Sequence, residues 1–344
     1  MNSPVLDKLS VVLPYAARTD YNNHERLITA LLPNIEALMA EGTLVKLPHS
    51  RRGYQHVFQT HVGNLYGHHP ILRIGSQNPA ICKGAVAFTL NPARYSSAEL
   101  STFHSILFRL LGDDAPAVLH GAKLQAMHSA LDIQDLEVNS LVLSTKRSRN
   151  FETYSTVGDA DMPGRTSGMY FGKLGSASRT CVYEKHTEQK YRQVEAMKAA
   201  KTEQEEQRIL GIYQRLLDGK PVTRIECRWD KLNGLPLHLA HTMPNRFAML
   251  DFRYIDLTLF DQSKEIGREL LLEAKLFISH VRAVGIDKAL EDYRPSRTMH
   301  TRVKRLWDKS EIKLCDPITV FNETIDALKA LPFFPREAFE NPNQ

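Results

Sequence analysis

The sequence predicts an α+β protein with a mainly antiparallel central sheet, flanking helices and a helical C-terminal region. Segments with a period of two, which is typical of strands, recur along the chain up to residue 260, and helical periodicity dominates after it. Hydrophobic residues make up 42% of the 344 residues, which is enough to bury a large core. We therefore expect an α+β domain over residues 1–260 and a helical region over residues 261–344.

The individual elements follow from apolar spacing and from capping and turn residues. The expected strands are 10–14, 54–62, 70–74, 84–91, 126–133, 139–144, 168–172, 179–185 and 222–229. The expected helices run from Asn22 or Asn23 to residue 40, from Ser97 to near Gly112, and over 186–217, 264–284, 296–308 and 320–331. The segment 186–217 is highly charged, so we expect a solvated helix that packs along one narrow stripe.

Composition narrows the classes of function. The net charge of +5 is a mild basic excess, which is compatible with a polyanionic partner. No apolar run reaches 18 residues, and the N-terminus lacks the hydrophobic core of a signal peptide, so we expect no membrane segment and a cytoplasmic location. The four cysteines form no CxxC pair and are expected to be reduced core thiols: Cys82, Cys181, Cys227 and Cys315.

Three of the expected strands carry polar side chains on one face. Alternation places Arg179, Cys181, Tyr183 and Lys185 on one face of their strand, Arg224, Glu226 and Arg228 on one face of theirs, and His128 and Asp132 on one face of a third. The opposite face of the 222–229 strand is apolar. Such a sheet has either a solvated polar face or a site.

If the polar faces converge, the residues suit phosphodiester chemistry. Asp132 and Glu226, with His128 as a further candidate, suit a hard divalent cation such as Mg²⁺ or Mn²⁺. Tyr183 becomes a usable nucleophile if neighbouring cations favour its phenolate. The surrounding Arg and Lys side chains would hold phosphates and neutralise charge in the transition state.

Each feature taken alone also has a structural explanation. Tyr183 suits an amphipathic strand at a sheet edge, and Asp132 suits a strand end that leads into a turn. The alternating charges of residues 224–228 suit a cross-strand ladder of salt bridges. The basic turn 146–149 and the basic helix 297–305 suit solvated surfaces.

Four short motifs follow one another between residues 130 and 228. They are Ala130-Leu131-Asp132-Ile133; Gly168-x-Tyr170-x-Gly172 with Ser176; Tyr183-Glu184-Lys185 with Glu188; and Arg224-x-Glu226-x-Arg228. In this order they resemble the replication initiation factor family, the Rep_trans-type rolling-circle initiators of plasmids and filamentous phages. The segment 88–92, with its Asn-Pro turn, resembles the phage branch, and the resemblance covers residues 84–230.

The resemblance implies a site-specific DNA nicking and joining enzyme. Tyr183 would attack the scissile phosphate, forming a 5′-phosphotyrosine link and a free 3′-OH that primes a polymerase. Asp132 and Glu226 would hold Mg²⁺ or Mn²⁺, and Glu188 would orient Lys185 or serve the metal. The residues implied in binding phosphates are Lys185, Arg179, Arg224 and Arg228. Origin recognition must come from elsewhere, and the candidates are the basic turn, with Lys146, Arg147 and Arg149, and the basic helices.

The chain departs from the family pattern at two positions. His128 stands where the family often has Asp, and Cys181 stands where it often has Arg, so Arg179 on the same face is the candidate replacement. The implied partners are a replication origin, single-stranded or cruciform, a host helicase and polymerase, and a second copy of the chain.

Two alternatives remain open from the sequence. A conjugative relaxase would use the same chemistry, and the sequence shows no sign of an appended helix-turn-helix or coupling domain, which favours replication over transfer. A non-catalytic origin-binding or repressor protein is the other alternative, and the departures at His128 and Cys181 favour it.

Overall fold

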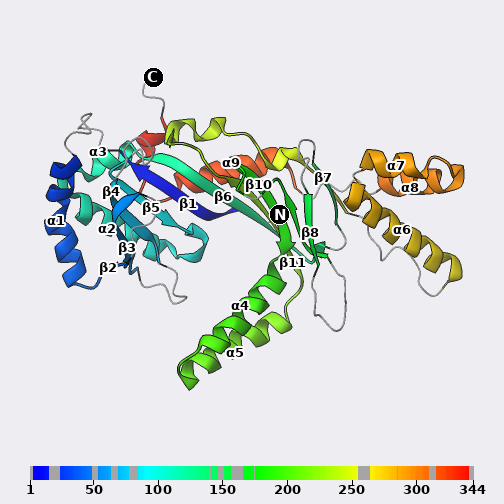
Figure 1. The fold of residues 1–344 in the computed structure, drawn as a ribbon, viewed down its shortest axis with the longest axis horizontal. Helices are drawn as coiled ribbons and strands as arrows, with labels where there is room; N and C mark the ends of the chain where they lie inside the picture. The colour runs from blue at the N-terminus through cyan, green and yellow to red at the C-terminus, as the bar shows by residue number, and fades with distance from the viewer. Residues whose placement is uncertain are drawn as a thin grey trace.

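The computed structural model describes residues 3–14, 24–48, 53–62, 69–76, 84–138, 141–145, 151–155, 166–173, 175–254, 264–284, 286–309 and 315–340 (Figure 1). The strands are β1 (Val5–Leu13), β2 (Leu44–Lys46), β3 (Tyr54–Thr60), β4 (Ile71–Ser76), β5 (Val86–Leu90), β6 (Lys123–Gln134), β7 (Leu141–Thr145), β8 (Phe151–Ser155), β9 (Thr166–Phe171), β10 (Ser178–Glu184), β11 (Val222–Trp229), β12 (Leu235–Pro236) and β13 (Leu250–Tyr254).

Within these residues, eleven strands form one antiparallel sheet and two form a separate sheet. The order along the large sheet is β2-β3-β4-β5-β1-β6-β11-β10-β9-β8, and β12 pairs with β6 off this path. The second sheet pairs β13 with β7. The predicted α+β class with a mainly antiparallel sheet is confirmed.

Helices cover parts of this sheet and also extend beyond it. They are α1 (His24–Ala40), α2 (Ser97–Leu111), α3 (Ala115–His120), α4 (Lys185–Ala199), α5 (Glu203–Leu217), α6 (Glu265–Val284), α7 (Ile286–Tyr293), α8 (Arg297–Lys309) and α9 (Pro317–Lys329), with short 3-10 helices η2 (Pro92–Arg94), η3 (Gly112–Asp114), η5 (Leu237–Thr242), η6 (Phe247–Met249) and η8 (Arg336–Phe339). The α4–α5 hairpin projects from the sheet, and α6, α7 and α8 gather beyond β7 (Figure 1).

Each strand expected from the sequence overlaps a strand of the structure, whereas several helix boundaries differ. The expected helix 186–217 is two helices, because the chain turns after Ala200 and Thr202 caps α5 by accepting a hydrogen bond from the backbone N–H of Glu205 at 3.2 Å. Lys185 begins α4 instead of ending a strand. The helix α2 is capped by Ser96, which forms a capping box with Glu99.

The apolar face of the central strands forms the main core. Ile225, Cys227 and Trp229 are fully buried, as the alternation predicted. The Trp229 ring lies 6.1 Å from that of Phe321 in α9 and 6.2 Å from that of Phe247 in η6, measured between centroids. The helix α9 therefore covers the back of the strands whose polar side faces the other way.

One buried polar contact joins α9 to β6. The hydroxyls of Ser129 and Thr324 lie 2.8 Å apart, and both side chains are buried. Because a buried hydroxyl without a partner is costly, this hydrogen bond fixes the position of α9 along β6.

The predicted helical region 261–344 divides into two parts. The helices α6, α7 and α8 have a hydrophobic cluster of their own, whereas the apolar residues of α9 and of the segment after it belong to the main core. Phe333 lies 5.5 Å from Phe88 and 5.8 Å from Phe103, between ring centroids. The predicted boundary at residue 261 therefore separates α6–α8 from the main core, whereas α9 and the segment after it belong to that core.

The cysteine prediction is confirmed where it can be checked. Cys181, Cys227 and Cys315 are free thiols and are buried. Cys82 lies outside the described residues. A search of the described helices finds none with the length and apolar character that a bilayer span requires.

Replacing Phe333 tests whether the C-terminal segment belongs to the main core. We expect Phe333→Ala to lower the free energy of unfolding by about 3–5 kcal/mol, because it removes a fully buried ring. The control Ile318→Ala, at a side chain that is 65% exposed, should change it by about 0.5 kcal/mol or less. Chemical denaturation measures both, and equal small losses would contradict a shared core.

Candidate active site

The strands β6, β11 and β10 lie side by side, and their pairing sets the polar face. In the register of these strands, Arg224 lies opposite Asp132 and Tyr183, Glu226 lies opposite Cys181, and Arg228 lies opposite His128 and Arg179. Residues directly opposite in neighbouring strands share a face of the sheet. The structure therefore places the two acidic residues and the tyrosine predicted from the sequence on one face, in adjacent rows.

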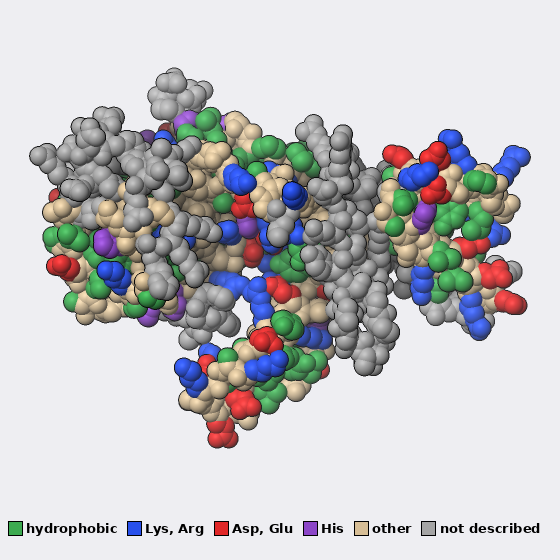
Figure 2. Space-filling model, viewed as in Figure 1, with side chains coloured by type: hydrophobic (Ala, Val, Ile, Leu, Met, Phe, Trp, Pro, Cys, Tyr) green, Lys and Arg blue, Asp and Glu red, His purple; other side chains and the backbone are tan. Residues whose placement is uncertain are grey.

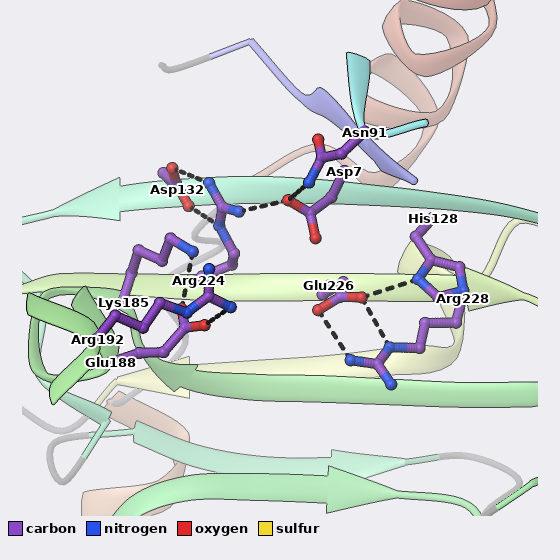
Figure 3. A network of polar contacts seen from close by, with 10 residues as sticks. All are labelled: Asp7, Asn91, His128, Asp132, Lys185, Glu188, Arg192, Arg224, Glu226 and Arg228. Atoms are coloured by element: carbon purple, nitrogen blue, oxygen red, sulfur yellow. Dashed lines mark hydrogen bonds and ion pairs between the residues drawn. The ribbon is translucent and has the colours of Figure 1, made fainter. Parts of the chain in front are cut away.

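Glu226 is at the centre of one polar network (Figure 3). Its Oε1 accepts a hydrogen bond from Nε of Arg228 at 2.7 Å, and its Oε2 accepts one from Nη2 at 3.1 Å. Nδ1 of His128 lies 3.1 Å from Oε1, and Nε2 of the same ring lies 3.1 Å from Oδ1 of Asp230. Burial opposes ionisation of Glu226, yet these hydrogen bonds lower its pKa to about 2. Glu226 is therefore a carboxylate at neutral pH.

A second network surrounds Arg224. Its Nε and Nη2 each donate to one oxygen of Asp132 at 2.6 Å, and its Nη1 donates to Asp7 at 2.9 Å. Asn91 also donates to Asp7, at 3.2 Å. Although burial opposes its charge, the bonds to Asp132 raise the pKa of Arg224. All three nitrogens of the Arg224 guanidinium therefore donate hydrogen bonds to carboxylates.

Tyr183 is a protonated phenol in this environment. Burial raises its pKa above the ordinary value, and the negative charges of Glu188 and Glu226 raise it further. The ammonium of Lys185 lies 5.8 Å from the centre of its ring. The predicted stabilisation of a phenolate by neighbouring cations is therefore not met by this arrangement, and the phenol must lose its proton as it reacts.

The N-terminal half of α4 holds three charged side chains near this tyrosine. Nζ of Lys185 donates to Glu188 at 2.7 Å, and Arg192 also pairs with Glu188 (Figure 3). Burial and the nearby Arg224 lower the pKa of Lys185. The contact between Glu188 and Lys185 that the sequence suggested is present.

The two departures from the family pattern have distinct structural outcomes. His128 takes part in the Glu226 network as a hydrogen-bond partner. Cys181 is fully buried, and burial raises its pKa to about 12, so its thiol stays uncharged. The guanidinium of Arg179 lies 4.5 Å over the ring of Tyr170, on which it stacks.

A cavity of about 520 Å³ opens on this polar face. Its cations are Lys8, Arg94, Arg192 and Arg228, its acids are Asp7, Glu188 and Glu226, its phenols are Tyr95, Tyr170 and Tyr183, and His69, Asn91 and His128 also line it. Figure 2 shows Lys and Arg side chains around the hollow between the main body and the α4–α5 hairpin. The volume suits a small-molecule or nucleotide-sized group, and the cations suit phosphate.

The predicted site residues fall into three groups. Tyr183, Glu226, His128 and Arg228 line the cavity. Asp132, Arg224, Arg179 and Lys185 lie on the same face or next to it but do not line the wall. Lys146, Arg147 and Arg149 lie outside the described residues.

Several cavity residues were not predicted from the sequence. Asp7 and Lys8 come from β1, where a register shift between Leu6 and Lys8 interrupts regular pairing with β6. Arg94 comes from η2, directly after the Asn-Pro turn, and this turn was the one available sequence signal. The pairing of β1 with β6 joins segments more than a hundred residues apart, so no local pattern reveals it.

The predicted metal site is not assembled as the side chains stand. Across the described residues, no group of three or more His, Cys, Asp or Glu side chains is arranged to hold a cation. Arg228 and His128 form hydrogen bonds with Glu226, and Arg224 forms hydrogen bonds with Asp132. A cation could bind Glu226 only if one of these partners moved away. Binding of Mg²⁺ or Mn²⁺ stays a prediction.

Comparison of the sequence with protein-family models and with curated proteins gives no match. Among solved structures, the chain is similar to a rolling circle replication initiator protein from Geobacillus stearothermophilus. The TM-score is 0.37 and the identity 13%, over 79% of this chain and 96% of that one. A likeness of this size says nothing about activity, so the functional conclusion rests on the site.

The pH dependence of stability tests the Glu226 network. The pKa of Glu226 is lowered from 4.5 to about 2, so the stabilisation from its ionised form is fully present above pH 4.5 and is lost as the pH falls towards 2. We expect this group to contribute a loss of roughly 3 kcal/mol in unfolding free energy over that range. Glu226→Gln should lack most of this loss and should already be less stable at neutral pH.

The matched control for this measurement is Glu195→Gln. Glu195 forms an exposed ion pair with Lys198 on α4, and such pairs contribute little. The control should therefore keep the wild-type pH profile. Equal acid sensitivity of Glu226→Gln and wild type would show that the network does not hold the carboxylate.

Proposed function

We propose that the protein initiates rolling-circle replication by cutting one DNA strand and holding the cut end on Tyr183. The observation that supports this most strongly is the convergence in one cavity wall of Tyr183, Glu226, Arg228 and His128, which come from three adjacent strands. A phenol beside cations, in a cavity of nucleotide size, is suited to attack on a phosphodiester.

In the proposed step, the phenolic oxygen of Tyr183 forms a bond to phosphorus while the bond from phosphorus to the 3′ oxygen breaks. Arg228 and Arg192, both in the cavity wall, stabilise charge on the phosphate oxygens. The phenolic proton passes to Glu188, because Glu226 with a pKa of about 2 is a weak base. Glu188 then releases this proton to solvent, and the departing 3′ oxygen takes one proton from solvent and becomes the 3′-OH primer.

The finer parts of the proposal follow from the sequence resemblance. They are an origin in single-stranded or cruciform form, assistance from Mg²⁺ or Mn²⁺, a host helicase and polymerase as partners, a homodimer, and a location in the cytoplasm. A conjugative relaxase with the same chemistry is the alternative within this class.

A second candidate function is origin binding without catalysis. The observation that favours it is that both predicted metal ligands, Asp132 and Glu226, are bonded to guanidinium groups and that the pKa of Tyr183 is raised. Such a protein would bind DNA through the same cations but would form no covalent link.

A covalent-adduct assay separates these functions. With supercoiled or single-stranded DNA carrying the origin, and with Mg²⁺ or Mn²⁺ supplied, we expect wild-type protein to form a denaturation-resistant protein–DNA link. Tyr183→Phe should reduce it to about 1% or less, because the nucleophile is removed, and should keep DNA affinity. Gel mobility of labelled DNA after denaturation measures the link.

Two other tyrosines supply the controls. Tyr191→Phe, on α4 and 67% exposed, should keep full activity. Tyr170→Phe removes a second phenol of the cavity wall, on the strand β9 next to β10. An adduct that survives in Tyr183→Phe and disappears in Tyr170→Phe would move the nucleophile to Tyr170. DNA binding by wild type without any adduct would support the non-catalytic alternative.

A further inference from the structure

The helices α6, α7 and α8 form a three-helix unit with its own core. Its cluster contains Phe277, Ile278 and Val281 from α6, Ala289 from α7, and Val303 and Trp307 from α8. The Phe277 ring lies 6.4 Å from that of Trp307, at an interplanar angle of 87°. Edge-to-face packing of this kind stabilises the three helices against one another.

The helices α7 and α8 are joined by a short connection, as in helix-turn-helix motifs and in helical hairpins. The helix α7 ends at Tyr293, three residues follow, and α8 begins at Arg297. Ser296 caps α8 by accepting a hydrogen bond from the backbone N–H of Met299 at 3.3 Å. A connection of three residues between two helices is typical of both motifs. The sequence did not predict α7, which has eight residues.

The outer face of α8 is basic and polar. Because Val303 and Trp307 face the core, Thr301, Lys304 and Arg305 are exposed. A shallow cleft of about 500 Å³ is lined by His300, Thr301, Lys304, Arg305 and Asp308. Between residues 264 and 309 the chain has eleven Lys and Arg against seven Asp and Glu, so this unit carries +4 of the total net charge of +5.

The cations of α8 have different partners. Arg302 forms an ion pair with Glu273 of α6, with Nη1 and Oε1 2.9 Å apart, and this pair holds α8 against α6. Within the part of the chain that the structure describes, neither Lys304 nor Arg305 lies within 4 Å of a carboxylate. Both side chains are exposed on the outer face of α8.

We infer that α8 binds duplex DNA through its Thr301–Arg305 face. Its 13 residues span about 20 Å, and a helix of this width fits the major groove. Lys and Arg contact phosphates and guanine edges, and Thr and His supply further hydrogen bonds to bases. A membrane surface is disfavoured, because the apolar side of α8 is used in the core of the unit.

The choice of DNA over another polyanion rests on the proposed function. The cavity at Tyr183 would hold the strand that is cut, whereas α8 would hold the intact duplex beside it. The two surfaces belong to different parts of the chain, so variants in one do not remove residues of the other.

The double variant Lys304→Ala/Arg305→Ala tests this surface in the full-length protein. With a short labelled duplex of mixed sequence, followed by fluorescence anisotropy, we expect Kd to rise about tenfold at low salt. The slope of log Kd against log salt concentration should fall by about 2, because two phosphate contacts are lost. The matched control, Lys275→Ala/Lys288→Ala, removes two exposed charges from α6 and α7 and should leave the slope unchanged.

An adduct assay and a second variant, Thr301→Glu, test the same surface. The Lys304→Ala/Arg305→Ala variant should form the Tyr183 adduct on a single-stranded oligonucleotide as well as wild type does, so failure of the proposed catalysis and failure of this surface are separate results. If that variant melts early, Thr301→Glu, which adds a negative charge to the same exposed face, should weaken duplex binding instead. Equal losses in the two double variants would overturn the inference. So would no duplex binding by wild type at low salt, or binding only to vesicles rich in phosphatidylserine.

Discussion

The pairing of β11 between β6 and β10 is the constraint on which the candidate site depends. Alternation along β11 sends Ile225, Cys227 and Trp229 into the core and Arg224, Glu226 and Arg228 to the opposite face. A slip by one residue would place the three apolar side chains on the polar face and the three charges in the apolar core, away from their partners, which is costly on both counts. The free energy that forms the core therefore also fixes which phenol, carboxylate and guanidinium meet on the other side of the sheet.

The charges of the polar face neutralise one another in the absence of ligand. Arg224 holds Asp132 and Asp7, while Arg228 and His128 hold Glu226. Glu226, which is nearly removed from water, needs such partners, because an unpaired buried charge is destabilising. A phosphate entering the cavity must compete with Glu226 for Arg228. Phosphate binding and the opening of the ion pair between Arg228 and Glu226 are thus coupled at Arg228.

The sequence predicted the strands of the site better than its helices. Period-two alternation over 179–184 and 222–229 is a local property and gave the correct faces. Lys185 was misplaced, because the start of α4 depends on where the chain leaves the sheet. Asp7 and Arg94 could not be predicted, because they reach the site through the pairing of β1 with β6 and β5. The contribution of the C-terminal segment to the main core could not be predicted for a similar reason, since the rings of Phe333 and Phe334 pack against a residue far upstream, Phe88.

The hydrogen bond between Ser129 and Thr324 joins residues that are 195 positions apart. Because α9 follows β6 in the chain, neither the hydroxyl of Thr324 nor the apolar side of α9 is present when β6 is synthesised. Until α9 has been made, the core behind the central strands is incomplete. A nascent chain at this stage presents a hydrophobic strand surface to chaperones and to other nascent chains.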